Sequence, residues 1–560
     1  MKKTDYLILS VLQLFIILFV ARYQTIPGNI DADYYFMGGV RLAQGHGFTE
    51  NFIWNYFNDP ASIPQPSHSY WMPLASILTA LGMWLTGSQS FAAGRLAFIV
   101  LSVLVTPLTA ALAYRLTSRR DLAIFAGLLS LFSGFYLPYL PVTENYSIFM
   151  VLGALYFLNI DHPLQCHPEP RSGEESLPLH QRPFANAQGD MPKARNITYF
   201  ILGILSGLMS LARSDGMIWL ALTFLLIAFR YWQDWRDATP HLSKPKLASL
   251  LINLSLTLAG FLLIMLPWYL RNIAVFGAPM SAGARHAFWL TDYYQTFIYP
   301  ASQLTYQHWL TSGWDAILAL RMSAFQRVLY NIVVVQGIIV LIPFIVVGAW
   351  KLRHKSQVRL GLTVWVLLIV VFIFIFPLAG VRGSYYHAVS ALQPLLWALT
   401  PMGLSVLLQK LQPRWKIFQL PKLDLILQST LVLLTGFITY SSVNALVLTN
   451  GWQRGELTYP KVEVFLLQQN IQPSEPVMVT NPPGYTMMTG RSAVMFPYGG
   501  EKSILEVAQK FNAHYIVLKP DPVNLSAHFN ALYDQPDLYP SIQFIGQVDD
   551  MRIYKVDLNP

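Results

Sequence analysis

Cysteine and charged side chains are both scarce in this chain of 560 residues. Cys166 is the single cysteine, which excludes an internal disulfide framework and any metal cluster built from several thiolates. Asp, Glu, Lys and Arg make up only 12% of the residues, whereas soluble domains contain about twice that share. Together with the 54% of hydrophobic residues, this composition indicates a polytopic membrane protein.

A cleavage site for a signal peptidase is also missing. Met1-Lys2-Lys3 precedes the first apolar run, as it would in a signal peptide, but Ala21-Arg22-Tyr23 matches the small-residue cleavage pattern poorly. We therefore expect the first apolar run to remain as a span.

Apolar runs long enough to cross a bilayer recur along the chain. We predict about eleven spans, near 6–23, 92–116, 122–140, 145–160, 197–212, 216–232, 248–269, 330–350, 359–379, 387–408 and 425–447. The run 73–87 is only about 15 residues long, which is typical of a re-entrant or interfacial helix.

Basic residues fix the predicted topology. If the N-terminus is cytoplasmic and 73–87 does not cross, the Lys and Arg residues between spans gather in the cytoplasmic loops, as the positive-inside rule requires. They include Arg119, Arg120, Arg230, Arg236, Lys351, Arg353, Lys410 and Arg414. The formal net charge of +9 is therefore a topology signal, and its distribution over short loops argues against a nucleic-acid partner.

Two segments differ in composition from the spans. Loop 161–196 is rich in Pro and polar residues without periodicity, so we expect a disordered cytoplasmic insertion. The segment 449–560 carries 8 Lys/Arg against 11 Asp/Glu, and 477–480, 515–519, 542–548 and 551–556 look like strands, with a helix at 501–511. We predict a small soluble α/β domain there, on the extracytoplasmic side.

These features divide the chain into three predicted parts. Residues 1–300 form a catalytic transmembrane module with a large first outer loop at 24–91, 301–448 add further transmembrane helices, and 449–560 form the soluble domain. The predicted fold class is mostly α, with juxtamembrane helices in the first outer loop.

The predicted topology places an unusual set of polar residues on the outer face. Asp31 and Asp33 follow the first span, and Glu144 opens the fourth. The others flank later spans and are Arg213, Asp215, Arg271, Arg382 and His387. Burying ionisable side chains at membrane depth costs free energy, so such residues usually have a function. A cluster of acids and bases there suits the binding of an anionic lipid headgroup and a proton-transfer reaction.

Each residue also has a simpler interpretation. Asp31 or Asp33 would cap the helix expected at 34–44, and Glu144 would favour a helix start. Arg213 and Asp215 would form a local ion pair in a turn. The remaining residues, Arg271, Arg382 and His387, would serve at the lipid interface.

In order along the chain, several motifs resemble the glycosyltransferase C-fold enzymes that use polyprenyl-phosphate-linked sugars. The protein O-mannosyltransferase and lipid A aminoarabinose transferase branch is the most similar. The motifs are DADYYFMGGVRLAQGHGF, MP with the run to LTG and FAAGR, VTENYS, LARSDG, and PWYLRN with FGAP. They cover roughly residues 1–300. Asp31-Ala32-Asp33 replaces the adjacent acidic pair of the family, and Trp71-Met72 replaces a Glu-Lys pair.

The resemblance implies an inverting transfer of a sugar from a polyprenyl phosphate to an acceptor hydroxyl. It implies a catalytic acid at Asp31 or Asp33, a second acidic residue at Glu144, and an Arg213 that meets the lipid phosphate. Asp31 or Asp33 would act as the base for the hydroxyl. Two residues apart, these carboxylates diverge by about 200° on a helix and share a face only on an extended chain.

No cofactor is required by this chemistry, although a divalent ion bridging Asp33 and Glu144 is compatible with the sequence. The expected location is the bacterial inner or plasma membrane. The expected partners are the polyprenyl-phosphate-linked sugar, membrane lipids, and an acceptor that is a lipid, a glycan or a protein. A competing function is a lipid or polysaccharide transporter, or a polymerase, of the cell envelope; a transporter would show internal repeats with paired broken helices, which the sequence lacks.

Overall fold

The computed structural model describes residues 1–160, 185–237, 246–280, 283, 286–413, 420–449, 451–452, 454–519, 532–533 and 536–558, except for the side chains of 185–195, 454 and 536. The predicted loop 161–196, with Cys166, lies largely outside these residues. Its last part is instead the start of a long helix, α8 (Ala185–Ala212).

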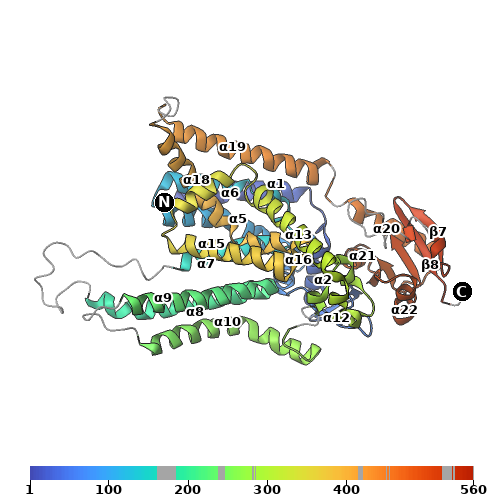
Figure 1. Cartoon of the computed structure of the whole chain (residues 1–560). Coiled ribbons are helices and arrows are strands. Elements are labelled where there is room, and N and C mark those ends of the chain that lie inside the picture. Colours follow the sequence, from blue (N-terminus) through green and yellow to red (C-terminus); the bar gives the residue numbers. More distant parts are fainter. Residues whose placement is uncertain are drawn as a thin grey trace, which may run out of the picture.

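A bundle of apolar helices forms the larger part of the molecule (Figure 1). Among the described residues, seven helical segments are long and apolar enough to span a membrane, or eight if one bent pair counts as a span. The seven segments are Lys3–Arg22, Phe91–Thr117, Ser214–Arg236, Leu247–Phe276, Gly313–Gln336, Ser356–Ile375 and Leu423–Thr449. Exposed Leu7, Ile8 and Phe15 on α1 (Lys3–Arg22) give it a lipid-facing surface. The predicted polytopic helical fold is confirmed.

Several predicted spans are shorter in the structure. Helix α6 (Arg120–Leu131) stops before Gly134, which adopts a positive φ of 60°. The predicted span 330–350 is broken into a π-helical turn at Asn331–Gln336 and α14 (Ile342–Lys351), with Pro343 in the first turn of α14. Helix α13 (Gly313–Tyr330), which precedes it, was not predicted.

Small residues allow two long helices to pack closely. In α8 and α10 (Leu247–Phe276), a Cβ added at Gly203 would lie 2.1 Å from the carbonyl oxygen of Thr257, and one at Gly260 would lie 2.3 Å from that of Phe200. Close backbone approach through small residues is the usual packing of membrane helices. It sets the position of the C-terminal end of α8, where Arg213 follows.

Short helices of the first outer loop cover one end of the bundle. They are α2 (Ile30–Ala43), α3 (Leu74–Thr86) and α4 (Phe91–Gly94). With 13 residues, α3 is too short for a straight span, in agreement with its expected interfacial role. Near the same end lie α12 (Tyr306–Thr311) and α16 (Pro377–Arg382).

The C-terminal region is an α/β unit at this end, opposite the N-terminus of the chain (Figure 1). The predicted strands are present as β4 (Val477–Val479), β6 (Tyr515–Leu518), β7 (Ile542–Val548) and β8 (Met551–Val556), and the predicted helix as α22 (Glu501–Phe511). The sheet order is β2-β5-β4-β6-β8-β7, with β2, β5, β4 and β6 parallel and the β6-β8 and β8-β7 pairs antiparallel. The C-terminal α/β fold prediction is confirmed.

Two features of this sheet were not expected. Its edge strand β2 (Phe52–Ile53) comes from the first outer loop and pairs with β5 (Ala493–Met495). The segment Pro482-Pro483-Gly484, although made of residues typical of turns, opens helix α21 (Pro482–Thr489). Proline is tolerated in the first turn of a helix, where its missing N–H has no partner to lose. The pairing of β2 with β5 joins the sheet to the first outer loop.

Candidate active site

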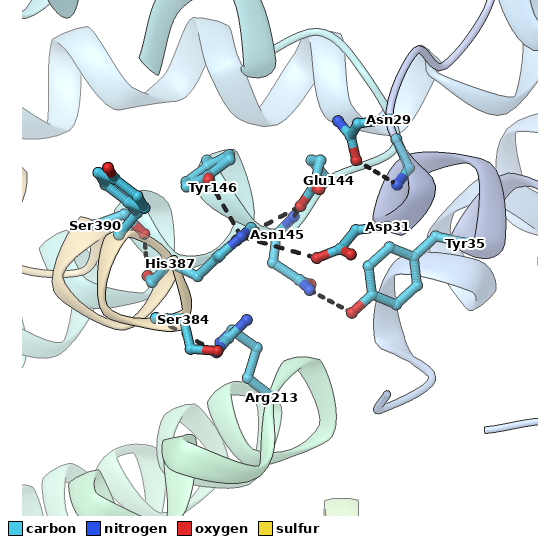
Figure 2. A network of polar contacts seen from close by, with 12 residues as sticks. Asn29, Asp31, Tyr35, Glu144, Asn145, Tyr146, Arg213, Ser384, His387 and Ser390 are labelled. Carbon is cyan, nitrogen blue, oxygen red and sulfur yellow. Dashed lines mark hydrogen bonds and ion pairs between the residues drawn. The ribbon is translucent and has the colours of Figure 1, made fainter. Parts of the chain in front are cut away.

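Asp31 lies in the first turn of α2, but it does not cap the helix. The cap is Asn29, whose Oδ1 accepts the backbone N–H of Ala32 at 2.9 Å. The Asp31 carboxylate is therefore free of a capping role and points toward α7 (Asn145–Asn159) and α17 (Ser384–Ser390), as Figure 2 shows. Its side chain is 25% exposed, which leaves it accessible to a substrate.

Glu144 approaches Asp31 from the start of α7. Its Oε2 accepts the backbone N–H of Asn145 at 3.0 Å, so the helix-start interpretation is correct, yet the same oxygen also faces the cluster. Asn145 Nδ2 donates to the hydroxyl of Tyr35 at 2.8 Å, and Thr143 Oγ1 donates to the carbonyl of Ala32 at 2.8 Å. These two bonds lock the beginning of α7 onto α2.

His387 completes the cluster from a broken helix. Helix α17 and α18 (Gln393–Leu411) meet at an angle of 64°, and such breaks at membrane depth are tolerated where they line a cavity. His387 Nε2 lies 3.9 Å from Asp31 Oδ2, and its Nδ1 lies 3.6 Å from Glu144 Oε2. The imidazole is held flat against the ring of Tyr146, with centroids 4.2 Å apart.

A buried cation lies beside these groups (Figure 2). Arg213 forms an ion pair with Asp215, with Nη2 2.9 Å from Oδ2, and its Nη2 also reaches the carbonyl oxygen of Ser384 at 3.5 Å. The local ion pair suggested for LARSDG is therefore real. Only 13% of the Arg213 side chain is exposed, so its charge acts on Asp31 with little screening.

Burial dominates the acidity of the two carboxyls of the cluster. It raises the pKa of Asp31 to about 6, against the opposing effect of Arg213. Burial and then the nearby Asp31 raise the pKa of Glu144 well above its usual range. The Arg213 cation favours the ionised form of Asp31, the form that can accept a proton.

Asp33 does not join this cluster. On the helix it turns away from Asp31, as the spacing of two residues requires, and its side chain is completely buried. Its Oδ2 accepts a hydrogen bond from Asn481 Nδ2 at 2.9 Å, and burial raises its pKa to about 7. The catalytic candidates of the first loop therefore face two different environments.

The other candidates lie elsewhere at the same end. Arg271 is surrounded by Trp268 and Phe276 and donates to the carbonyl oxygens of Phe48 and Ser67 at 3.1 and 2.9 Å, so it anchors the first outer loop. Arg382 lies over the ring of Tyr293, 3.9 Å from its centroid. No contact of either Arg with Asp31, Glu144 or His387 is found among the described residues.

The donor set of the cluster fits a divalent metal ion. One ligating atom each from Asp31, Glu144 and His387 lies within 4.8 Å of the others. His387 Nδ1 is buried without a hydrogen-bond partner, as an imidazole nitrogen reserved for a ligand would be. Carboxylate oxygens with one imidazole suit Zn²⁺ or Mn²⁺. The structure groups Asp31, rather than the predicted Asp33, with Glu144.

Sequence reasoning missed three further polar residues. Asn481 and Glu456 lie in the C-terminal region and reach Asp33 only through the tertiary fold. Glu50 is buried in the first outer loop, where its Oε1 accepts from Gln65 Nε2 at 2.7 Å, and burial raises its pKa to about 8. The signal available for Asn481 was its position before Pro-Pro-Gly, which is typical of a helix N-cap.

The fold and this arrangement define a multi-pass helical membrane protein with a C-terminal α/β domain. No protein-family model and no curated protein matches the chain. Among solved structures it is similar to ArnT from Cupriavidus metallidurans bound to undecaprenyl phosphate, at 13% identity, covering 99% of this chain and 98% of that one with a TM-score of 0.53.

The oligosaccharyltransferase AglB from Archaeoglobus fulgidus is also similar. Its complex with an inhibitory peptide and a dolichol-phosphate has 15% identity, covers 92% of this chain and 69% of that one, and gives a TM-score of 0.52. A structure of the Archaeoglobus fulgidus oligosaccharyltransferase in complex with Zn and sulfate has 14% identity, covers 92% of this chain and 68% of that one, and gives a TM-score of 0.54. At such identities the likeness establishes the fold.

Proposed function

We propose that this protein is an integral-membrane inverting glycosyltransferase. It moves a sugar from a polyprenyl-phosphate donor to an acceptor hydroxyl on the extracytoplasmic side of the bacterial inner or plasma membrane. In this proposal the N-terminus is cytoplasmic and the C-terminal α/β domain is extracytoplasmic. The observation that carries it is the convergence of Asp31, Glu144 and His387 beside the buried Arg213, at the end of the bundle opposite the N-terminus.

The roles follow from position and charge. Asp31 takes the proton of the acceptor hydroxyl while that oxygen bonds to the anomeric carbon. The bond from this carbon to the phosphate oxygen breaks on the opposite face, and the polyprenyl phosphate leaves with the electron pair. Arg213 stabilises the departing phosphate, because a preorganised cation in a buried site acts where negative charge develops. A polyprenyl phosphate is a good leaving group, so no strong general acid is needed.

Glu144 and His387 hold the geometry around Asp31. The imidazole of His387 lies within 4 Å of the carboxylates of both Asp31 and Glu144, and the ring of Tyr146 fixes its orientation. A divalent ion held by Asp31, Glu144 and His387 would supply positive charge to orient the acceptor or the phosphate. The oligosaccharyltransferase complex with Zn, which shares this fold, supports testing such an ion.

The decisive experiment is transfer by the purified full-length protein in proteoliposomes. A panel of undecaprenyl-phosphate-linked ¹⁴C-sugars is offered with host membrane lipids and proteins as acceptors, and the label is followed into each fraction. We expect incorporation by the wild type and by Asp549→Asn, a control at an exposed residue. Movement of an undecaprenyl-phosphate-linked sugar across the bilayer without incorporation would favour the transporter alternative instead.

A further inference from the structure

The second carboxylate of the first outer loop is held by the C-terminal domain. We propose that Asp33 is a positioning residue, through which that domain fixes the N-terminal turn of α2 and, with it, the Asp31 carboxylate. The proposal rests on the proposed function of Asp31 as the base. It assigns the C-terminal domain a part in catalysis without contact between that domain and the reacting atoms.

The contact is short, buried and specific. Asp33 is 0% exposed, and its Oδ2 accepts from Asn481 Nδ2 at 2.9 Å. The same Nδ2 donates to Glu456 Oε1 at 3.3 Å, so one amide serves two carboxyl groups. The carboxyl groups of Asp33 and Glu456 also interact directly with each other. The other charged groups that face this contact are Asp31 on α2 itself and Lys519, which acts on Glu456. Separating these groups would leave a buried donor or acceptor without a hydrogen-bond partner, which costs free energy of folding. The fold therefore favours keeping the contact.

Asn481 performs two tasks with different atoms. Its Oδ1 accepts the backbone N–H of Gly484 at 3.1 Å and caps α21, while its Nδ2 points outward to Asp33. A Cβ added at Gly484 would lie 2.9 Å from Asp33 Oδ2, so the carboxylate rests directly on the first turn of α21. Capping and docking can therefore be separated by substitution at a single position.

A second contact holds the chain just before α2. The indole Nε1 of Trp452 donates to the carbonyl oxygens of Ile26 and Pro27, each at 3.1 Å. Gly28 has a φ of +92°, and a Cβ there would lie 1.9 Å from Nε1 of Trp452. The segment from Ile26 to Asp33, which contains Asp31, is thus hydrogen-bonded at both of its ends to residues of the C-terminal domain.

Helix α21 lies against α2 at the junction of the helical bundle and the α/β unit (Figure 1). Asp31 and Asp33 belong to the same helical turn and face in different directions. By fixing the rotation of α2 about its axis and its position along that axis, Asp33 can therefore position the Asp31 carboxylate without contacting the cluster. A misplacement of a base by about 1 Å can lower the rate by about 10²-fold.

The test uses three substitutions in the full-length protein. Asp33→Asn replaces the carboxylate by an amide whose oxygen can still accept the hydrogen bond from Asn481. Asp33→Ala removes the acceptor. Asn481→Ser keeps an oxygen that caps α21 but removes the donor. We expect Asp33→Asn to stay within about threefold of wild type. Asp33→Ala and Asn481→Ser should lose about 10- to 100-fold in kcat, with the KM for the donor within about twofold.

The pairing also predicts a lack of additivity. The double variant with Asp33→Ala and Asn481→Ser should lose about as much as the worse single variant, because both substitutions remove the hydrogen bond between Asp33 and Asn481. Asp549→Asn, the same kind of exchange at an exposed site of the C-terminal domain, should match wild type. If Asp33→Asn loses as much as Asp33→Ala, the carboxylate itself is needed. If Asn481→Ser transfers like wild type, the contact with Asn481 is not needed. Either result overturns the positioning role.

A second measurement needs no substrate. Hydrogen exchange of the backbone amides of residues 30–36 reports on the first turns of α2 in the intact protein. We expect faster exchange there in Asp33→Ala and Asn481→Ser, and no change in Asp549→Asn. Unchanged exchange would overturn the proposal. Faster exchange in a protein that transfers no sugar would keep the docking contact and refute the proposed function instead.

Discussion

The imidazole of His387 lies flat on the phenol ring of Tyr146, with an interplanar angle of 11° and the hydroxyl 3.2 Å from Nε2. The contact joins α7 to α17 and leaves only one plane in which the imidazole can lie. In that plane Nδ1 faces Glu144 and Nε2 faces Asp31. The aromatic residue therefore sets the geometry of the cluster without carrying charge.

Substitution of Tyr146 separates stacking from hydrogen bonding. Aromatic contacts of this kind contribute about 0.5–1.5 kcal/mol, and each 1.4 kcal/mol is about tenfold in rate. We expect Tyr146→Phe, which keeps the stack, to lose no more than about threefold in kcat, and Tyr146→Ala to lose about tenfold. Steady-state transfer assays give both values. Equal losses in the two variants would mean that the hydroxyl, and not the stack, positions His387.

Asp31→Asn removes the proposed base while preserving shape. General-base catalysis contributes about 10²–10⁴-fold, so we expect kcat to fall by that amount with an unchanged thermal unfolding midpoint. The matched control is Asp33→Asn, the same exchange two residues along the same helix, which should remain active. Near-wild-type transfer by Asp31→Asn would remove this residue from the mechanism.

The pH profile of transfer should follow the ionisation of Asp31. Burial raises its pKa to about 6, and only the carboxylate can accept a proton. The rate should therefore be low at pH 5, rise about tenfold per pH unit below the pKa, and level off above pH 7. Initial rates between pH 5 and 8.5 test this, with donor binding measured in parallel. A rate that is flat from pH 5 to 7 would contradict a base with this pKa.

Much of the bundle follows from local sequence, because a membrane span needs only length and apolarity. The strands at 477–480, 515–519, 542–548 and 551–556 were also predictable from β-branched and aromatic residues. Strand β2 was not, because two residues such as Phe52 and Ile53 carry no periodicity and pair with a strand from the other end of the chain.

The site was predicted in part. Topology alone placed Asp31, Glu144 and His387 on one side of the membrane, and they do meet. It could not separate them from Arg271 and Arg382, which lie at the same end of the molecule but contact aromatic rings and loop carbonyls. The separation of Asp31 from Asp33 depended on the loop being helical there, and on Asn481, 448 residues away from Asp33.

Glu50 should make stability depend on pH. Its folded-state pKa is raised to about 8 by burial, whereas an exposed glutamate titrates near 4.5. Between these values the folded protein retains a proton that the unfolded chain has lost, so this contribution to stability is present below about pH 4.5 and is lost as the pH rises through 8. Glu50→Gln keeps the neutral form at all pH values. We expect its unfolding midpoint to exceed that of wild type at pH 8.5 and to match it at pH 5.

Divalent ions test the cluster independently of transfer. Asp31, Glu144 and His387 offer two carboxylates and an imidazole within 4.8 Å, and His387 Nδ1 has no other partner. We expect the wild type, dialysed against Mn²⁺ or Zn²⁺ and then freed of excess ion, to retain about one equivalent by elemental analysis, and His387→Ala to retain much less. His68→Ala is the matched control, because both ring nitrogens of that buried histidine already contact Ser67 and Ser76. Equal metal content in the two histidine variants would show that His387 does not hold the retained ion.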